Sequence, residues 1–377
     1  MSAAAQGPTR VEFSDIVGRR LRLGSWEDQK VSTYRKIQEA LAHERWSEAA
    51  QLASYFVDEA NVCFTLYRQW IADLQGFLRD SGVAAERVAE LDAEIQSKLN
   101  LPDGTPFVSR RVWHDFLGRV ETLVGLAHRG ERIAALAELD AMKETWRRCH
   151  DRDVDHTYGL MSAVVSELGE AAIGRMYERV LLPLFAWRYD KFDIDRHPWD
   201  EGLEALMLVA CEAMRGHLVG PERTGDFELV ETDDRFILRF DPCGSGGRTL
   251  RGDAIEGTPP RMQEPYGWSV SEEPHSWNHF QRGVCHYCSH CIVLMEEMPI
   301  DRFGYPVRVV DPPVYAADAA DPDRGMKCQW TMYKDPTAVP ESVYERVGRR
   351  KPAAFGSRAT GAPALPADAG LNMPGAG

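Results

Sequence analysis

The chain has 377 residues, of which 44% are hydrophobic and 27% are charged, a composition that excludes intrinsic disorder over most of its length. Its 58 acidic and 44 basic side chains give a formal net charge of −14, so we expect neither a nucleic acid nor an anionic membrane as a partner. Apolar runs stay short of the about 20 residues of a membrane-spanning helix, and the first residues lack the layout of a signal peptide. We therefore expect a soluble, cytoplasmic protein that acts on a small-molecule substrate; a homo-oligomer is left open.

Residues 26–220 are predicted to form a helical domain that follows an N-terminal arm, 1–25. Between Leu52 and Phe77, apolar residues recur at spacings of three and four, which places an apolar stripe on one face of a helix. Pro183 is expected to kink the helix that contains it. Similar stripes are present in 34–43, 108–128, 131–150, 154–166, 169–189 and 201–218.

The sequence changes in character after Pro221, and residues 222–350 are predicted to form a small mixed α/β domain carrying a Cys-rich metal site. Runs at 227–231 and 236–240 flank a polar turn and predict a β-hairpin, and 306–310 and 328–333 predict two further strands. One helix is expected from Tyr287 to Met298, ended by Pro299. The final segment, 351–377, is rich in Gly, Pro and Ala and is predicted to be a disordered tail. The predicted fold class is therefore α+β, with an N-terminal helical bundle.

The eight cysteines need an explanation, because disulfides are rare in a reducing compartment. Cys63, Cys149 and Cys211 fall on or near apolar stripes and are predicted to be core residues. The other five lie in the second part of the chain, close to several histidines. The predicted metal ligands are Cys243, Cys285, His286, Cys288, Cys291 and Cys328.

Three kinds of centre agree with this pattern. Zinc needs about four tetrahedral ligands, which the five cysteines supply. An iron–sulfur cluster would also use the C-x2-C-x2-C run, although the C-x3-C-P continuation is missing. A thiol redox pair would need only Cys288 and Cys291. Zinc or another divalent metal is the favoured cofactor, and iron or an iron–sulfur cluster is the alternative.

Three residues are candidates for catalysis. Glu296 lies five residues past Cys291 and is the predicted general base on a metal-bound water, unless it belongs to an ordinary solvated helix end. Arg248 follows the glycine-rich run CGSGG and could hold a substrate carboxylate, although the run also suits a tight turn. His290 completes the predicted catalytic set. A weaker cluster, His150–His156, could bind a metal or line a pocket, but a salt-bridged face is the commoner explanation.

Four stretches carry a family resemblance: FDPCGSGG (240–247), HYCSHC (286–291), GYPVRVV (304–310) and KCQWTMY (327–333). Through them, residues 145–335 resemble the L-2-amino-thiazoline-4-carboxylic acid hydrolase-like proteins and, more distantly, 4-vinyl reductase domains. The resemblance implies a cysteine-bound zinc that joins a helix to the last strand, including Cys288 or Cys291 with Cys328. It also implies a small-ligand pocket between the helices and the sheet. Cys285, the CGSGG loop and the long helical N-terminal part depart from the family.

The sequence therefore predicts a metal-dependent enzyme, most simply a hydrolase acting on a small organic acid or ring compound. The alternative is a zinc-stapled module that binds a small aromatic molecule without catalysis, and a redox or iron–sulfur protein is a third possibility. No helix-turn-helix, kinase or ATPase motif accompanies the metal-site pattern, which favours an enzyme over a sensor.

Overall fold

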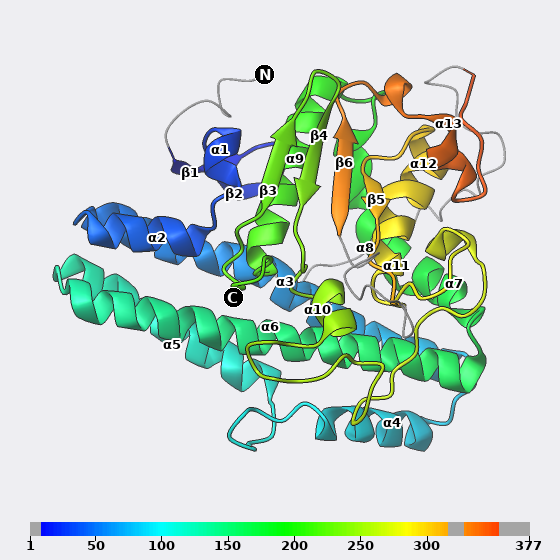
Figure 1. The fold of residues 1–377 in the computed structure, drawn as a ribbon, viewed down its shortest axis with the longest axis horizontal. Helices are drawn as coiled ribbons and strands as arrows, with labels where there is room; N and C mark the ends of the chain where they lie inside the picture. Colours follow the sequence, from blue (N-terminus) through cyan, green and yellow to red (C-terminus); the bar gives the residue numbers. More distant parts are fainter. Residues whose placement is uncertain (1–8, 316–327, 354–377) are drawn as a thin grey trace.

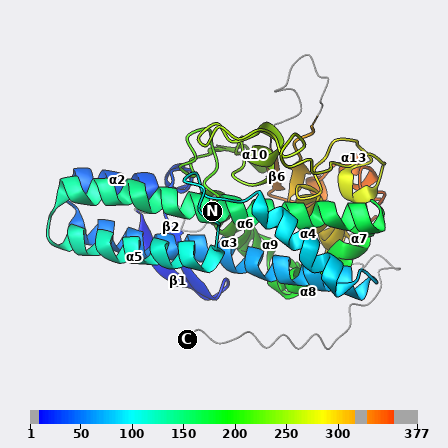
Figure 2. The same cartoon turned by 90° about the horizontal axis from the view of Figure 1, so that it is seen from below.

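Long helices form the first half of the molecule. The computed structural model describes residues 9–315 and 328–353. α3 (Trp46–Asp80) and α6 (Arg132–Leu168) pack against each other and, at 1.5 Å per residue, are each roughly 50 Å long. α2 (Thr33–Ala42) and α5 (Ser109–His128) pack against both of these helices. α4 (Ala85–Ser97) contacts α3 and the C-terminal half of α6. Figure 2 shows these helices as an elongated bundle.

The apolar stripes explain why these segments are helical. The stripe from Leu52 to Phe77 is buried on α3, as predicted. The stripes at 131–150 and 154–166 belong to a single helix, α6, because no helix-breaking residue separates them. α4 was not predicted; its buried residues Val88, Leu91 and Ile95 have helical spacing but are few.

Short helical segments connect the bundle to the second half. After α6 the chain forms α7 (Ala172–Met176), a π-helical turn (Tyr177–Leu181) and α8 (Leu182–Ala186). Pro183 lies in the first turn of α8, directly after this irregular turn. A 3-10 turn (Trp187–Phe192) then leads to α9 (Trp199–Gly216), which packs against α3.

A four-stranded antiparallel sheet forms the second half. Its strands are β3 (Glu228–Glu231), β4 (Arg235–Arg239), β5 (Val309–Asp311) and β6 (Gln329–Tyr333), in the order β3-β4-β6-β5. The predicted hairpin and both further strands are thus confirmed, and so is the α+β class. In Figure 1 the sheet stands over one half of the bundle, with α10 (Gly246–Arg251) between the strand ends and α6.

Two segments differ from the prediction. The predicted arm contains a hairpin, β1 (Arg10–Ser14) and β2 (Arg19–Leu23), followed by α1 (Trp26–Gln29). The helix expected to end at Pro299 instead continues to Phe303. Pro299 lies in the first turn of a new α-helical segment, where its missing N–H leaves no bond unmade. This helix comprises α11 (Ser289–Ile292), a π-helical turn (Val293–Glu297) and α12 (Met298–Phe303).

One hydrophobic core runs through both halves, from Leu21 to Val347. Cys63, Cys149 and Cys211 are buried in it, which confirms their predicted role. Outside the sheet lie 3-10 turns at Ser276–Asn278 and Pro336–Ala338, and a last helix, α13 (Glu341–Glu345). Within the described ranges, every helix is too short or too polar to cross a bilayer. Most of the predicted tail, 354–377, lies outside the described residues.

Candidate functional site

Two strands and a loop bring Cys243 and Cys328 together. Cys243 follows β4 and Cys328 directly precedes β6, and the two strands are antiparallel neighbours. The N–H of Phe240 donates to the carbonyl of Cys328 at 3.3 Å, which extends the pairing towards Cys243. The side chain of Cys328 is the largest cause of the lowered pKa of Cys243, so the two thiols interact. Two cysteines that are far apart in the sequence are therefore brought into one region of the fold.

Cys285 and Cys288 form a second pair beside the first. Their sulfur atoms are 2.8 Å apart, and the N–H of Cys288 donates to Sγ of Cys285 at 3.1 Å. A methyl group on Gly246 would lie closer than 3.0 Å to Sγ of Cys288, so the loop can approach this pair only with glycine at that position. A methyl group on Gly244 would likewise clash with the carbonyl oxygen of His217. The glycines of CGSGG therefore serve close packing of the loop.

The pairing makes the four thiols electrostatically unequal. The side chain of Cys328 has the largest effect on Cys243; with the N–H of Gly247 and with Ser245, it lowers the pKa of Cys243 to about 6 against the opposing effect of burial. The same interaction and burial raise the pKa of Cys328 well above its usual range. Burial and the neighbouring Cys285 likewise raise the pKa of Cys288. Near neutral pH, Cys243 is the thiolate of its pair.

Cys291 and His290 lie at the edge of this cluster. Cys291 is half-buried, and Sγ is 3.4 Å from Nε2 of His290. Burial lowers the pKa of His290 to about 4, so its imidazole is neutral at pH 7. Its Nδ1 is hydrogen-bonded to the carbonyl of Tyr287, and its ring makes an edge contact with Trp70 at 5.2 Å between centroids. The ring is therefore fixed beside Cys291.

A chain of buried polar side chains leads from the cysteine-bearing segment into the helical bundle. The hydroxyl of Tyr287 lies 2.6 Å from the hydroxyl of Tyr67 on α3. The Tyr67 hydroxyl is 3.2 Å from Nδ1 of His217. The same nitrogen is 2.8 Å from Nε2 of His150 on α6. Groups that can both donate and accept hydrogen bonds therefore form a continuous path.

The path ends at Asp151. Nδ1 of His150 is 2.9 Å from Oδ1 of Asp151. Burial lowers the pKa of His150 and holds that of His217 well below its usual range, so both imidazoles are neutral at pH 7. A neutral imidazole donates from one nitrogen and accepts at the other, so His150 can donate from Nδ1 to Asp151 and accept at Nε2 from Nδ1 of His217.

Two carboxylates of α6 fix the surrounding loops. Asp151 pairs with Arg223 at 2.6 Å, and Asp155 pairs with Arg248 at 2.6 Å and with Arg261 at 2.9 Å, all buried. Burial by itself raises the pKa of Asp151, but Arg223 and Arg248 outweigh it and hold that pKa well below its usual range. These pairs tie the loop after β4 to the bundle.

The predicted catalytic residues Arg248 and Glu296 already have partners. Arg248 donates to the carbonyl of Gly244 at 3.1 Å, in addition to its pairing with Asp155. Glu296 is fully buried, accepts from the N–H of Val310 at 2.6 Å, and pairs with Arg346 and with His279 at 2.8 Å. Their roles in holding a substrate and in activating water stay predictions.

His286 is the predicted ligand whose surroundings differ most from those of the cysteines. Its ring lies 6.0 Å from that of Trp277, and neither ring nitrogen has a hydrogen-bond partner among the described residues. Burial, followed by the charge of His275, lowers its pKa to about 3. The five cysteines lie in one region, whereas the ring of His286 lies beside Trp277 and makes no hydrogen bond to a described residue.

The arrangement of donors can be compared with what zinc requires. Thiolates are suitable zinc ligands, and tetrahedral sites use about four of them. In residues 9–315 and 328–353, however, no group of three or more His, Cys, Asp or Glu side chains is arranged to hold a metal ion. Zinc as the cofactor therefore stays a prediction.

Tyr67 and His217 were not among the site residues predicted from the sequence. Tyr67 lies on the buried stripe of α3, where its ring looks like one more apolar residue, and only its hydroxyl signals a polar role. His217 is the C-cap residue of α9. His150 belongs to the cluster that sequence analysis assigned to a metal, a pocket or a salt-bridged face, and its members in fact point to several partners around α6.

Comparisons with known proteins found no match among protein-family models, curated proteins or solved structures. The resemblance to the L-2-amino-thiazoline-4-carboxylic acid hydrolase-like proteins and to 4-vinyl reductase domains therefore stays a prediction.

Proposed function

We propose that this chain is a thiol oxidoreductase whose redox pair is Cys243 and Cys328. The observation that carries the proposal is that the β4–β6 pairing brings the segments of Cys243 and Cys328 together, where Cys328 has the largest effect on the lowered pKa of Cys243. A structural disulfide is not needed there, because the surrounding core is already continuous. Cys243 and Cys328 are each 8% exposed, against 5% for Cys288 and 0% for Cys285, so the first pair is slightly the more accessible.

The proposed reaction is exchange with a small-molecule disulfide. The Cys243 thiolate attacks one substrate sulfur, the substrate S–S bond breaks, and one substrate thiolate leaves and takes a proton from water. Sγ of Cys328 then attacks Sγ of Cys243, passes its proton to the second substrate thiol as it leaves, and forms a Cys243–Cys328 disulfide. The two protein sulfurs have lost two electrons, which the substrate disulfide has taken up. An external dithiol restores the reduced pair by the reverse exchange.

A chromogenic aromatic disulfide tests this reaction in a single turnover. The reduced wild-type chain is expected to release two coloured thiols in its fastest phase. Cys328→Ser should release one and retain a mixed disulfide on Cys243, detectable by mass spectrometry. Cys211→Ser changes a buried core thiol and should behave as wild type. Equal release by wild type and Cys328→Ser would contradict the proposal.

The second candidate is the metal-dependent hydrolase predicted from the sequence, favoured by the gathering of five cysteines in one region. It requires the two pairs to rearrange around an ion. Metal analysis and an absorption spectrum of protein purified without oxygen distinguish the candidates. About one tightly held zinc per chain supports the hydrolase, and broad visible absorption supports an iron–sulfur cluster. A colourless, metal-free chain with reactive Cys243 supports the thiol oxidoreductase.

A further inference from the structure

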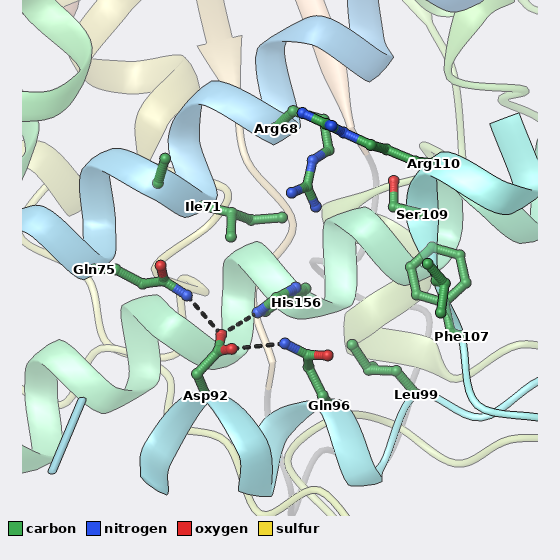
Figure 3. A pocket seen from close by; sticks show the side chains of 12 residues that line it. Arg68, Ile71, Gln75, Asp92, Gln96, Leu99, Phe107, Ser109, Arg110 and His156 are labelled. Atoms are coloured by element: carbon green, nitrogen blue, oxygen red, sulfur yellow. Dashed lines mark hydrogen bonds and ion pairs between the residues drawn. The ribbon is translucent and has the colours of Figure 1, made fainter. Parts of the chain in front are cut away.

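A second region of the molecule has the character of a ligand site. A pocket of about 390 Å³ opens between α3, α4, α6 and the start of α5 (Figure 3). No residue that lines it belongs to the cysteine cluster. Its volume is within the range of small-molecule sites and far larger than a single inorganic ion needs.

One side of the pocket is polar but already saturated. The carboxylate of Asp92 is 2.6 Å from Nε2 of His156, and it accepts from Nε2 of Gln75 at 2.8 Å and from Nε2 of Gln96 at 2.6 Å. Figure 3 shows these three contacts converging on Asp92. Because its oxygens are engaged, Asp92 is a poor partner for a further cation.

The opposite side carries positive charge without partners. Arg68 of α3 and Arg110 of α5 lie together there in Figure 3. Within the part of the chain that the structure describes, neither guanidinium has a hydrogen-bond or ion-pair partner. α5 begins at Ser109 with no side chain capping its N-terminus, so its free N–H groups add to the positive potential. Asp153, whose pKa is influenced by Arg68, accepts a hydrogen bond from Ser109.

Apolar side chains complete the lining. Ile71 and Leu99 are buried and Phe107 is half-buried, and all three face the same space. A ligand that satisfies both the guanidinium groups and this wall has an anionic group and an apolar body.

We propose that this pocket binds a small organic carboxylate, whose carboxylate is held by Arg68 and Arg110 and whose apolar body lies against Ile71, Leu99 and Phe107. Guanidinium groups recognise carboxylates through paired, charge-assisted hydrogen bonds. The site is independent of the proposed cysteine chemistry and stands or falls separately from it.

Isothermal titration calorimetry of the full chain with benzoate tests the proposal. Benzoate is expected to bind, whereas the neutral isostere benzamide and inorganic phosphate, which lacks an apolar body, should bind much more weakly. Arg68→Gln and Arg110→Gln should each weaken benzoate binding by about tenfold or more. Arg79→Gln removes the same charge from an exposed position on α3 and should leave binding unchanged.

Ala72→Phe supplies a variant that leaves the arginines intact. Ala72 lines the pocket from the exposed side of α3, so a larger side chain there should fill the cavity and abolish binding without loss of fold, as checked by circular dichroism. The proposal is overturned if benzoate does not bind, if benzamide or phosphate binds equally well, or if both arginine variants bind as wild type.

Discussion

The hydroxyl oxygens of Tyr67 and Tyr287 lie 2.6 Å apart and join the helical bundle to the segment that carries the cysteines. Both side chains are buried, so removing either hydroxyl removes a hydrogen bond from the core. Tyr67→Phe and Tyr287→Phe should each lower the free energy of unfolding by about 1–3 kcal/mol. In a double-mutant cycle measured by urea denaturation, the two losses should be less than additive by about 1 kcal/mol.

Tyr344→Phe is the control for this cycle. Tyr344 is buried and its hydroxyl donates to the carbonyl of Gly304, away from Tyr67. Its loss should add to that of Tyr67→Phe. Strict additivity between Tyr67 and Tyr287 would show that their bond contributes nothing.

Gly246→Ala tests the close approach of the glycine-rich loop to Cys288. The added methyl group has no room beside Sγ, and we expect a loss of about 1–3 kcal/mol in the free energy of unfolding, together with altered alkylation rates of Cys243 and Cys288. Gly118→Ala on exposed α5, where the space is open, should instead stabilise by about 0.5–1 kcal/mol. Unchanged stability of Gly246→Ala would mean that the loop does not lie against Cys288.

Asp155→Asn tests the buried ion pairs that anchor the loops. Arg248 and Arg261 would lose their shared carboxylate in the interior, and removing one partner of a buried pair typically costs about 3–5 kcal/mol. Glu167→Gln, which breaks a pair with the exposed Arg87, should cost less than about 1 kcal/mol. Thermal unfolding of both variants checks the contrast, and equal losses would contradict it.

Asp153 should make stability depend on pH. Burial raises its pKa to about 6 from an unfolded value of 3.8, so the folded chain holds a proton that the unfolded chain has lost between these values. Its contribution to stability is therefore present below pH 4 and lost as the pH rises through about 6, amounting to about 2–3 kcal/mol. Asp153→Asn keeps an acceptor for Ser109 and removes the titration. Relative to wild type, it should gain stability between pH 4 and pH 7 in urea denaturation; a constant difference would contradict the assignment.

Much of the fold follows from patterns that the sequence displays openly. The stripe from Leu52 to Phe77 has the period of a helix, and the alternating runs before and after residue 232 have that of strands, because each pattern reflects a local backbone geometry. The helix was wrongly predicted to end at Pro299. Proline ends a helix where its missing N–H removes a backbone hydrogen bond, but Pro299 lies in the first turn after a π-helical turn, where no such bond is lost.

The candidate site was predictable in composition and unpredictable in arrangement. Cysteine spacing identified the region but not the pairs, because the β4–β6 pairing brings the loop that carries Cys243 to the start of β6, where Cys328 lies. The partners of Arg248 and Glu296 also come from distant segments, such as Asp155 on α6 and Arg346 near the end of the described chain. Such contacts leave no local periodicity.

In the proposed reaction, Cys243 and Cys328 form and break a disulfide bond reversibly. Equilibration of the full chain in dithiothreitol buffers of graded potential, followed by acid quenching, alkylation and peptide mass spectrometry, measures this directly. We expect a reversible Cys243–Cys328 disulfide with a single midpoint, abolished in Cys243→Ser and unaffected in Cys211→Ser. The proposal would be contradicted if both residues stay alkylatable at every potential, or if Cys243 joins a different cysteine.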